Sequence, residues 1–392
     1  MTPRIAIVSN RYPVDGHDAA SPFVHDFCTS LQSLNAEVQV VTPYYPTDRQ
    51  ERDHWVTRFH WTSDTRVFSQ LSLTRPADMV SLVRALSVGK SATREMVDSF
   101  KPQAILALWA IPSGWWAMSA ARRLGIPFGI WALGTDIQVW AHRPIARGMI
   151  KRILRNAAWI YADGFALCDE VTKIAGRDCT FLPSQRMLAD RPESDAPHPN
   201  NGDRYFLYFG RLAREKGVLD LLSAAEQLGH NSDFKIVFAG LPDGSVEVQQ
   251  EISRRNLEQV CRYVGPLNPD HIFDYLRHAE AVVIPSHRDS IPLVLGEALQ
   301  ADTPVICSDL PDLCALLHRY HVGDVFETGN VLALARALET FKRPNELPLE
   351  ITRFLNDFGP AAAAGRFLED AAPTDLPAIS ARGTSRAGAE HA

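Results

Sequence analysis

The sequence predicts an α/β protein with two domains, each built around a parallel sheet. A chain of 392 residues is too long for one ordinary hydrophobic core and suits two domains of common size. Short apolar runs alternate with amphipathic helical stretches in both halves of the chain. Residues 183–203 are rich in Pro, Asp, Asn and Ser and lack a hydrophobic period, as a linker should. We therefore expect a first domain over 1–185, a linker over 186–203 and a second domain over 204–358.

The first domain opens with an apolar strand at 4–9, a loop at 10–22 and an amphipathic helix at 23–34. Further strands are expected at 38–42, 56–61, 104–108, 127–131, 159–161 and 179–182, with helices at 77–100 and 115–124. The first loop contains one glycine, Gly16, and no Gly-x-Gly-x-x-Gly. A dinucleotide-dependent dehydrogenase needs those glycines for its phosphate-binding turn, so this class is disfavoured.

A basic amphipathic stretch follows at 142–155. Its cations are Arg143, Arg147, Lys151, Arg152 and Arg155, interleaved with apolar residues. Such a helix can lie on an anionic membrane surface or bind a phosphate-bearing acceptor, and a solvated helix face is the alternative. The tryptophans of this region are explained mainly by core packing, with Trp109 and Trp140 as the two candidates for a site.

The second domain repeats the alternation. Strands are expected at 205–209, 235–239, 260–264, 281–284 and 305–307, and helices at 218–228, 246–256, 271–278, 293–301, 331–341 and 350–358. Gly240 and Gly265 follow two of these strands, where loops that contact a nucleotide belong in a parallel sheet. Strand termination alone is the other interpretation of these glycines.

Residues 285–304 predict a strand-loop-helix unit with acidic side chains. Ser290 is a candidate N-cap and Pro292 suits a first helical turn, where free amides and the helix dipole favour an anion such as a phosphate. Asp289 and Glu297 are separated by seven residues, so they lie about two helical turns apart. We expect the first to face a substrate and the second to face another part of the same ligand, with a plain surface loop and helix as the alternative.

A second motif, Gly-Arg-Leu-Ala-Arg-Glu-Lys-Gly, occupies 210–217 after an aromatic strand. Gly210 permits a tight turn, Arg211 offers a planar fork for a diphosphate, and Lys216 supplies a point charge. Solvated charges in a strand-to-helix turn are the alternative.

Together these motifs resemble those of retaining glycosyltransferases of family 4, which have the GT-B fold. The family's acidic pair corresponds to Asp289 and Glu297, and its Gly-Arg-Leu…Glu-Lys-Gly signature to residues 210–217. Residues 134–138 resemble its Gly-Ser-Asp-Ile turn, and 109–114 its His-Trp…Pro-x-Gly stretch. The resemblance implies two Rossmann-like domains facing across a cleft. It also implies a helix at 359–372 that crosses back to the first domain.

The resemblance also implies the roles of individual residues. Asp289 and Asp136 would be catalytic. The implied donor-binding residues are Gly210, Arg211, Lys216, Gly240, Gly265, Ser290, Ile291, Leu293 and Glu297, with Glu297 on the ribose hydroxyls; the acceptor-side residues are Gly16, Trp109, Thr135 and Trp140. The donor would be a nucleotide-diphosphate sugar and the acceptor a glycan, lipid-linked or small molecule, as in polysaccharide biosynthesis. We expect no metal and no other cofactor, because cationic side chains and helix amides can neutralise a leaving diphosphate.

Three positions depart from the family pattern. The first acid is Asp289 rather than Glu, and Leu108 and Leu133 replace histidines that often precede Trp109 and Gly134. These departures leave two alternatives to a glycosyltransferase open. One is a GT-B nucleotide-sugar epimerase, and the other is a non-catalytic pseudo-glycosyltransferase that binds a sugar nucleotide.

Composition and charge narrow the remaining classes. The chain is 46% hydrophobic and 22% charged, an ordinary globular composition, and its net charge of -6 disfavours nucleic-acid binding. It has no transmembrane-length apolar run and no signal-peptide layout, so we expect a cytoplasmic protein with at most peripheral contact, through 142–155, with the inner face of the cytoplasmic membrane. Its six cysteines lack metal-ligand spacing and are expected to be buried thiols. Residues 373–392 are expected to form a disordered tail.

Overall fold

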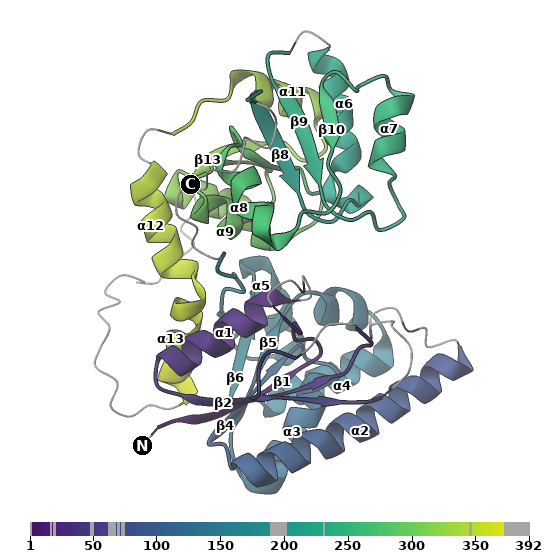
Figure 1. Ribbon diagram of the computed structural model, residues 1–392. Coiled ribbons are helices and arrows are strands. Elements are labelled where there is room, and N and C mark those ends of the chain that lie inside the picture. Colours follow the sequence, from purple (N-terminus) through teal and green to yellow (C-terminus); the bar gives the residue numbers. More distant parts are fainter. Residues whose placement is uncertain are drawn as a thin grey trace.

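The protein folds around two parallel sheets stacked along its long axis (Figure 1). This computed structural model describes residues 2–15, 18, 21–47, 51–61, 68, 71, 75–188, 202–229, 232–344 and 347–371. The expected α/β architecture with two domains is confirmed. The expected tail at 373–392 and most of the expected linker lie outside the described residues.

The first sheet has the strand order β3-β2-β1-β4-β5-β6-β7, all parallel. Its strands are β1 (Arg4–Ser9), β2 (Glu37–Pro43), β3 (Val56–Phe59), β4 (Ala104–Leu108), β5 (Phe128–Ala132), β6 (Trp159–Ala162) and β7 (Thr180–Phe181). Its helices are α1 (Pro22–Ser33), α2 (Pro76–Phe100), α3 (Ser113–Leu124), α4 (Pro144–Asn156) and α5 (Phe165–Ala175), with a π-helical turn at Asp136–Trp140.

The second sheet has the order β10-β9-β8-β11-β12-β13 and is also parallel. Its strands are β8 (Tyr205–Phe209), β9 (Lys235–Ala239), β10 (Cys261–Tyr263), β11 (Val282–Ile284), β12 (Val305–Ser308) and β13 (Gly323–Phe326). A 3-10 turn at Arg214–Lys216 precedes α6 (Val218–Leu228), and the later helices are α7 (Val248–Arg254), α8 (Pro269–Arg277), α9 (Leu293–Gln300), α10 (Pro311–Tyr320), α11 (Val331–Thr340), α12 (Leu347–Phe358) and α13 (Pro360–Ala371).

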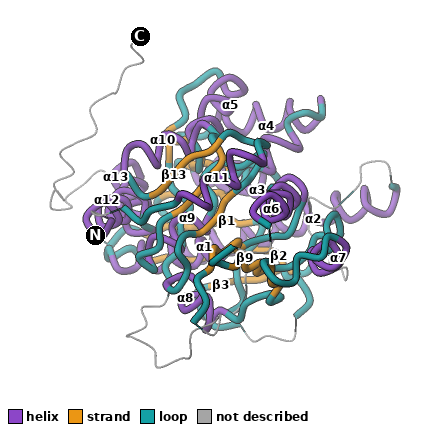
Figure 2. The backbone as a smooth tube through the Cα atoms, turned by 90° about the horizontal axis from the view of Figure 1, so that it is seen from above, coloured by secondary structure: helices purple, strands orange, loops and turns teal. Residues whose placement is uncertain are grey.

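Helices cover both faces of each sheet, because successive strand residues point to opposite faces. In β1, Ile5 and Ile7 pack toward α1 and α13, whereas Ala6 and Val8 pack toward α2, α3, α4 and α5. The second sheet has α8, α9, α10 and α12 on one face and α6, α7 and α11 on the other. The view from above shows the helices wrapped around both sheets (Figure 2).

Helix α13, the last helix in the described part of the chain, lies on the first domain rather than the second (Figure 1). Phe367 of α13 is fully buried among the aromatic rings of Phe27, Trp159 and Tyr161. The chain therefore crosses between the domains again at its end, and both domains depend on contacts with distant parts of the sequence.

Several local expectations need correction. Helix α9 begins at Leu293, and the preceding Pro292 is extended with ψ 145°, so Ser290 is not its N-cap. Helices α5 and α10 and strand β13 are additions to the predicted elements. Gly176, at φ 68°, directly follows α5, and α10 begins with a proline, which are ordinary helix boundary signals. Of the predicted buried thiols, Cys28, Cys168, Cys261 and Cys307 are buried, whereas Cys179 and Cys314 are partly exposed. No described helix is long and apolar enough to cross a membrane.

Candidate active site

The two motifs of the second domain meet at the carboxyl edge of its sheet. Lys216 donates from Nζ to Oδ2 of Asp289 over 2.6 Å, although 73 residues separate them. The hydroxyl of Ser286 donates to the same carboxylate oxygen over 3.1 Å. The amide of His287 donates to the carbonyl of Glu215 over 2.9 Å, so the two loops also touch through their backbones. The Lys216 and Asp289 side chains are only 22% and 15% exposed, which strengthens their attraction relative to an ion pair in open solvent.

Glycines make this close approach sterically feasible. A Cβ on Gly217 would lie 1.8 Å from the carbonyl oxygen of Pro285, and one on Gly240 would lie 1.7 Å from that of Gly210. The amide of Gly240 donates to the carbonyl of Gly265 over 2.9 Å. The predicted donor-binding glycines therefore stand side by side at the ends of neighbouring strands. A ligand bound at the carboxyl ends of these strands would therefore contact backbone atoms rather than side chains at these positions.

Arg211 lies near this edge but faces solvent. Its side chain is 56% exposed, and its guanidinium lies 3.2 Å from Glu215 and 3.9 Å from Asp243. Because both partners are also at least partly exposed, the guanidinium is weakly held. It is therefore free to reorient toward an anion.

Glu297 occupies a different environment from Asp289. It is only 4% exposed, its carboxylate pairs with Nε of Arg186, and burial raises its pKa while Arg186 opposes that rise. The carbonyl of Arg186 accepts from Nε2 of Gln300 over 2.8 Å, and a Cβ on Gly296 would lie 2.1 Å from Oε1 of Gln185. Helix α9 thus holds the segment that leaves the first domain. Sequence spacing gave no signal for Arg186, because its contact with Glu297 joins the start of the expected linker to a helix far along the chain.

The domains also touch where β6 ends. A Cβ on Gly164 would lie 2.8 Å from Cβ of Ser290, so the predicted donor-binding loop faces the first domain there. Asp312 of α10 accepts from the amide of Ala166 over 3.0 Å and so caps α5 across the domain boundary. Next to this junction, Asp163 accepts from the hydroxyl of Ser184 over 3.1 Å, and burial raises the pKa of Asp163 to about 7.

Asp136 is a buried anchor for two loops of the first domain. It is 1% exposed and accepts from the amides of Ala110 over 2.6 Å and Leu133 over 3.3 Å. Burial raises its pKa to about 6, and these amide bonds oppose the rise. The carboxylate thereby ties the turn after β5 to the turn after β4.

The predicted acceptor-side residues line one cavity of about 700 Å³ in the first domain. Trp109, Thr135 and Trp140 all contribute to its wall, as does Asp136. Trp109 is held at φ 68°, a conformation that costs free energy for a bulky residue and that recurs at binding sites. Gly16 lies outside the described residues.

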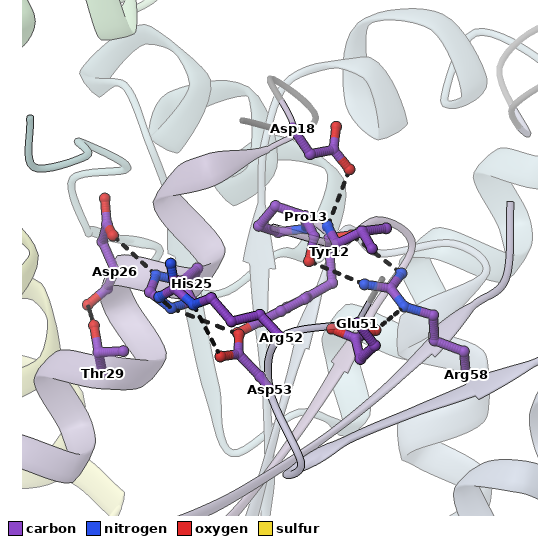
Figure 3. A network of polar contacts seen from close by, with 11 residues as sticks. Tyr12, Pro13, Asp18, His25, Asp26, Thr29, Glu51, Arg52, Asp53 and Arg58 are labelled. Carbon is purple, nitrogen blue, oxygen red and sulfur yellow. Dashed lines mark hydrogen bonds and ion pairs between the residues drawn. The ribbon is translucent and has the colours of Figure 1, made fainter. Parts of the chain in front are cut away.

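A polar network fixes the loop after β1 beside this cavity (Figure 3). Arg58 of β3 donates to the carbonyl of Tyr12 over 3.2 Å, and the Tyr12 hydroxyl donates to Asp53 over 2.8 Å. Asn10 and Arg11 of the same loop line the cavity. This network was not anticipated from the sequence, because its members come from separate segments.

The described residues contain no group of three His, Cys, Asp or Glu side chains placed to hold a metal ion. The structure instead forms a glycine-floored edge on the second sheet, meaning that Gly210, Gly240 and Gly265 follow its neighbouring strands, with the Lys216–Asp289 pair beside them. The first domain, on the other side, contains the cavity of about 700 Å³. Two facing parallel-sheet domains with this arrangement define the GT-B class of proteins.

Comparisons with known proteins agree with this class. Residues 19–172 match the family model of the glycosyl transferase 4-like domain, and residues 190–353 match that of glycosyl transferases group 1. The chain is 30% identical over 253 residues to the putative teichuronic acid biosynthesis glycosyltransferase TuaC of Bacillus subtilis (strain 168). That alignment covers 62% of this chain and 61% of the relative, so it spans less than two thirds of the relative's length.

Solved structures share the fold over nearly the whole chain. Sucrose-phosphate synthase from Thermosynechococcus elongatus superposes with a TM-score of 0.65 at 19% identity, covering 93% of this chain and 92% of that one. HepE of Anabaena in complex with UDP-glucose superposes with a TM-score of 0.68 at 14% identity, covering 93% and 98%. The chain belongs to the family 4-like glycosyltransferases with the GT-B fold, as its motifs predicted. A nucleotide-sugar epimerase is accordingly not favoured.

Proposed function

We propose that the protein is a retaining glycosyltransferase that moves a hexose-type sugar from a nucleotide-diphosphate sugar to a glycan, lipid-linked or small-molecule acceptor. The observation that carries the proposal is the contact between Lys216 and Asp289 at the glycine-floored edge of the second sheet. A protein of the same fold, HepE, is known in complex with UDP-glucose, and the relative TuaC is named as a putative glycosyltransferase. These likenesses support a sugar nucleotide as the donor.

In this proposal the cations act on the leaving diphosphate. Lys216 has three donors and uses one on Asp289, so it can hold that carboxylate and a phosphate together. Arg211 can swing from its exposed partners to the same phosphate. The amides of Ser290, Ile291 and Leu293 approach the diphosphate at the start of α9. No metal ion is needed for this arrangement, since two cations and a helix N-terminus already oppose the developing charge.

In this proposal the two carboxylates, Asp289 and Glu297, contact different parts of the donor. Asp289, oriented by Lys216 and Ser286, faces the transferred sugar. Glu297 acts on the ribose, and because Arg186 already contacts its buried carboxylate, the ribose hydroxyls share or replace that contact. Asp136 acts through its hold on the turns after β4 and β5, which carry Trp109 and Thr135.

The test is donor binding and turnover in a lysine variant. Stabilisation by uridine, guanosine and adenosine diphosphate sugars identifies the donor, because a ligand that binds the folded state raises the melting temperature. Lys216→Ala should then lower turnover by roughly ten- to a thousand-fold and weaken nucleoside-diphosphate binding. Lys235→Ala is the matched control, since Lys235 begins β9 and contacts Gln259 at the opposite edge. Sugar transfer by the wild-type protein should persist in EDTA, and the product should retain the anomeric configuration of the donor. Equal kinetics for the Lys216→Ala and Lys235→Ala variants would refute the placement of the diphosphate beside Lys216.

A non-catalytic sugar-nucleotide-binding protein is the second candidate. The observation that favours it is that Leu108 is fully buried in the first-domain core and Leu133 packs against that core, where the family often has histidines. Donor binding without transfer to any acceptor, in protein that hydrolyses no donor, would establish this second function.

Peripheral membrane contact through 142–155 forms part of the proposal. Helix α4 buries Ala146, Ile150, Ile153 and Leu154, while Ile145 is 88% exposed among basic residues. Such a surface favours an anionic bilayer. Sedimentation with vesicles containing an anionic lipid should carry the protein down at low salt, and a protein that stays in the supernatant would contradict the contact.

A further inference from the structure

The cavity in the first domain is apolar along most of its wall. Its volume of about 700 Å³ falls within the range of roughly 300–1,000 Å³ typical of ligand sites. Two helices supply most of its apolar lining: Met79, Leu82, Val83 and Leu86 from α2, and Ile145 and Met149 from α4. A wall of this kind favours hydrocarbon over a hydroxyl-rich sugar, because sugar hydroxyls need hydrogen-bond partners when they leave water.

Two of the polar side chains that line the cavity are already engaged in hydrogen bonds within the protein. Asn10 donates to the carbonyl of Ile111 over 3.0 Å and accepts from the amide of Ser113 over 3.2 Å. Asp136 accepts from two backbone amides. Both residues therefore shape the cavity rather than offer a full set of partners to a sugar. They follow strands β1 and β5, so the inner end lies at the carboxyl edge of the first sheet.

That edge faces the second domain. Gly164 follows β6 of the same sheet and lies against Ser290 of the donor-binding loop. The cavity thus extends from the surface of α2 and α4 toward the side on which the sugar donor is proposed to bind. An acceptor lying in it would direct its reactive end to the donor and its other end to the helices.

At the outer end of the cavity, several large apolar side chains are exposed to solvent. Met79, Val83 and Ile145 line the cavity and are 40%, 62% and 88% exposed. Exposed apolar residues gathered at the mouth of an apolar cavity indicate a continuous apolar path from the surface inward.

One guanidinium group lines this cavity, and a second lies against the ring of a residue that lines it. Arg11 lines it and lies 4.4 Å from the ring centre of Tyr45, and Arg143 lies 4.6 Å from that of Trp140. Nη1 of Arg143 is buried and makes no hydrogen bond with any described residue. Because this nitrogen is closed to solvent, Arg143 acts on the cavity through its charge, and Arg11 is the cation that a bound phosphate can contact.

We propose that this cavity binds the chain of a long-chain isoprenyl or alkyl phosphate, with Arg11 and Arg143 as counter-charges to its phosphate. The proposal rests on the proposed function, in which the first domain binds the acceptor, and it assigns that acceptor to the lipid-linked class. The hydrocarbon lies between α2 and α4, and the phosphate lies where the charge and the aromatic walls meet. The competing occupant is a neutral apolar acceptor, which would bind in the cavity without needing a phosphate group.

The first experiment measures binding of farnesyl phosphate below its aggregation concentration, by calorimetry or by the fluorescence of Trp109 and Trp140. Val83→Asp places a charge at the cavity wall on an exposed site and should weaken binding about tenfold or more. Val80→Asp is the matched control, because Val80 is 68% exposed on the same helix and does not line the cavity. The inference fails if wild-type protein does not bind farnesyl phosphate, or if Val83→Asp binds it as wild type does.

The second experiment tests the charge. Farnesyl phosphate should bind at least tenfold more tightly than farnesol, and Arg11→Gln should remove most of that difference, because Arg11 lines the cavity. Equal affinity for the two compounds in wild-type protein would refute the phosphate and assign the cavity to a neutral apolar acceptor.

Donor binding separates this inference from the proposed function. Val83→Asp should keep the thermal stabilisation that a nucleoside diphosphate gives to wild-type protein, since Val83 lies in the other domain. Farnesyl phosphate binding in a protein that no sugar nucleotide stabilises would refute the proposed function alone. Sugar-nucleotide binding without any chain-length preference among acceptors would refute the lipid inference alone.

Discussion

Asp163 shows how one buried carboxyl can make stability depend on pH. Burial raises its pKa from the ordinary 3.8 to about 7. Below pH 4 the folded and unfolded chains both hold the proton. Between about pH 4 and 7 the unfolded chain releases it while the folded chain retains it, so this residue lowers stability as the pH rises, and the loss levels off above pH 7.

We therefore expect Asp163→Asn to become more stable relative to wild type as the pH rises from 4 to 8, by on the order of 4 kcal/mol. Asparagine can still accept the hydrogen bond from Ser184. Urea unfolding at several pH values measures the difference, with Glu258→Gln at an exposed site as the control. A constant difference between Asp163→Asn and wild type across this range would show that Asp163 is ionised in the folded protein.

At the scale of elements, Gly217 sets the approach of the turn before α6 to the loop after β11. It has φ 71°, and a Cβ there would lie 1.8 Å from the carbonyl oxygen of Pro285. The backbone would have to move, and the contact of Lys216 with Asp289 depends on that backbone. The glycine thus supports a functional pair in which it takes no direct part.

Gly217→Ala should lower nucleoside-diphosphate affinity at least tenfold and unfolding free energy by about 2–4 kcal/mol. Gly125→Ala is a matched control at the end of α3, because Gly125 has φ 69° and ψ 27°, close to the φ 71° and ψ 18° of Gly217, and no atom within 4 Å of its would-be Cβ. It should cost only about 1–2 kcal/mol and leave affinity unchanged. Similar affinities for the two variants would show that the two motifs do not need this close approach.

At the scale of the whole molecule, helix α13 follows the second domain in the sequence but packs on the first domain and stabilises it. Phe367 of α13 is fully buried beside Phe27, whereas Phe354 of α12 is fully buried in the second-domain core. Phe367→Ala should destabilise the protein by about 3–5 kcal/mol. The loss of amide exchange protection should appear in β1 and β5 of the first domain.

Phe354→Ala, a change of the same volume, should instead lower protection in β11 and β12. Mass spectrometry of hydrogen exchange on the two variants distinguishes these patterns. Unchanged protection of the first domain in Phe367→Ala would mean that α13 docks without contributing to that core.

The sequence by itself determined the local structure and the class of protein. Apolar runs of strand length located β1 and β8 at their observed bounds, since side chains buried on both faces of a parallel sheet leave a continuous hydrophobic pattern. The glycine-rich motif at 210–217 and the acidic pair Asp289 and Glu297 identified the family, because such short motifs lie within single loops and helices.

Only the tertiary structure decided which charges meet. Lys216 pairs with Asp289 and Arg186 with Glu297 through contacts between segments far apart in the chain, and Asp312 caps α5 from the other domain. The apolar cavity likewise needs α2, α4 and the segments that follow β1, β2, β4 and β5 at once. Spacing along the chain predicts neighbours only within one helix or strand, whereas these contacts depend on how the sheets and domains pack.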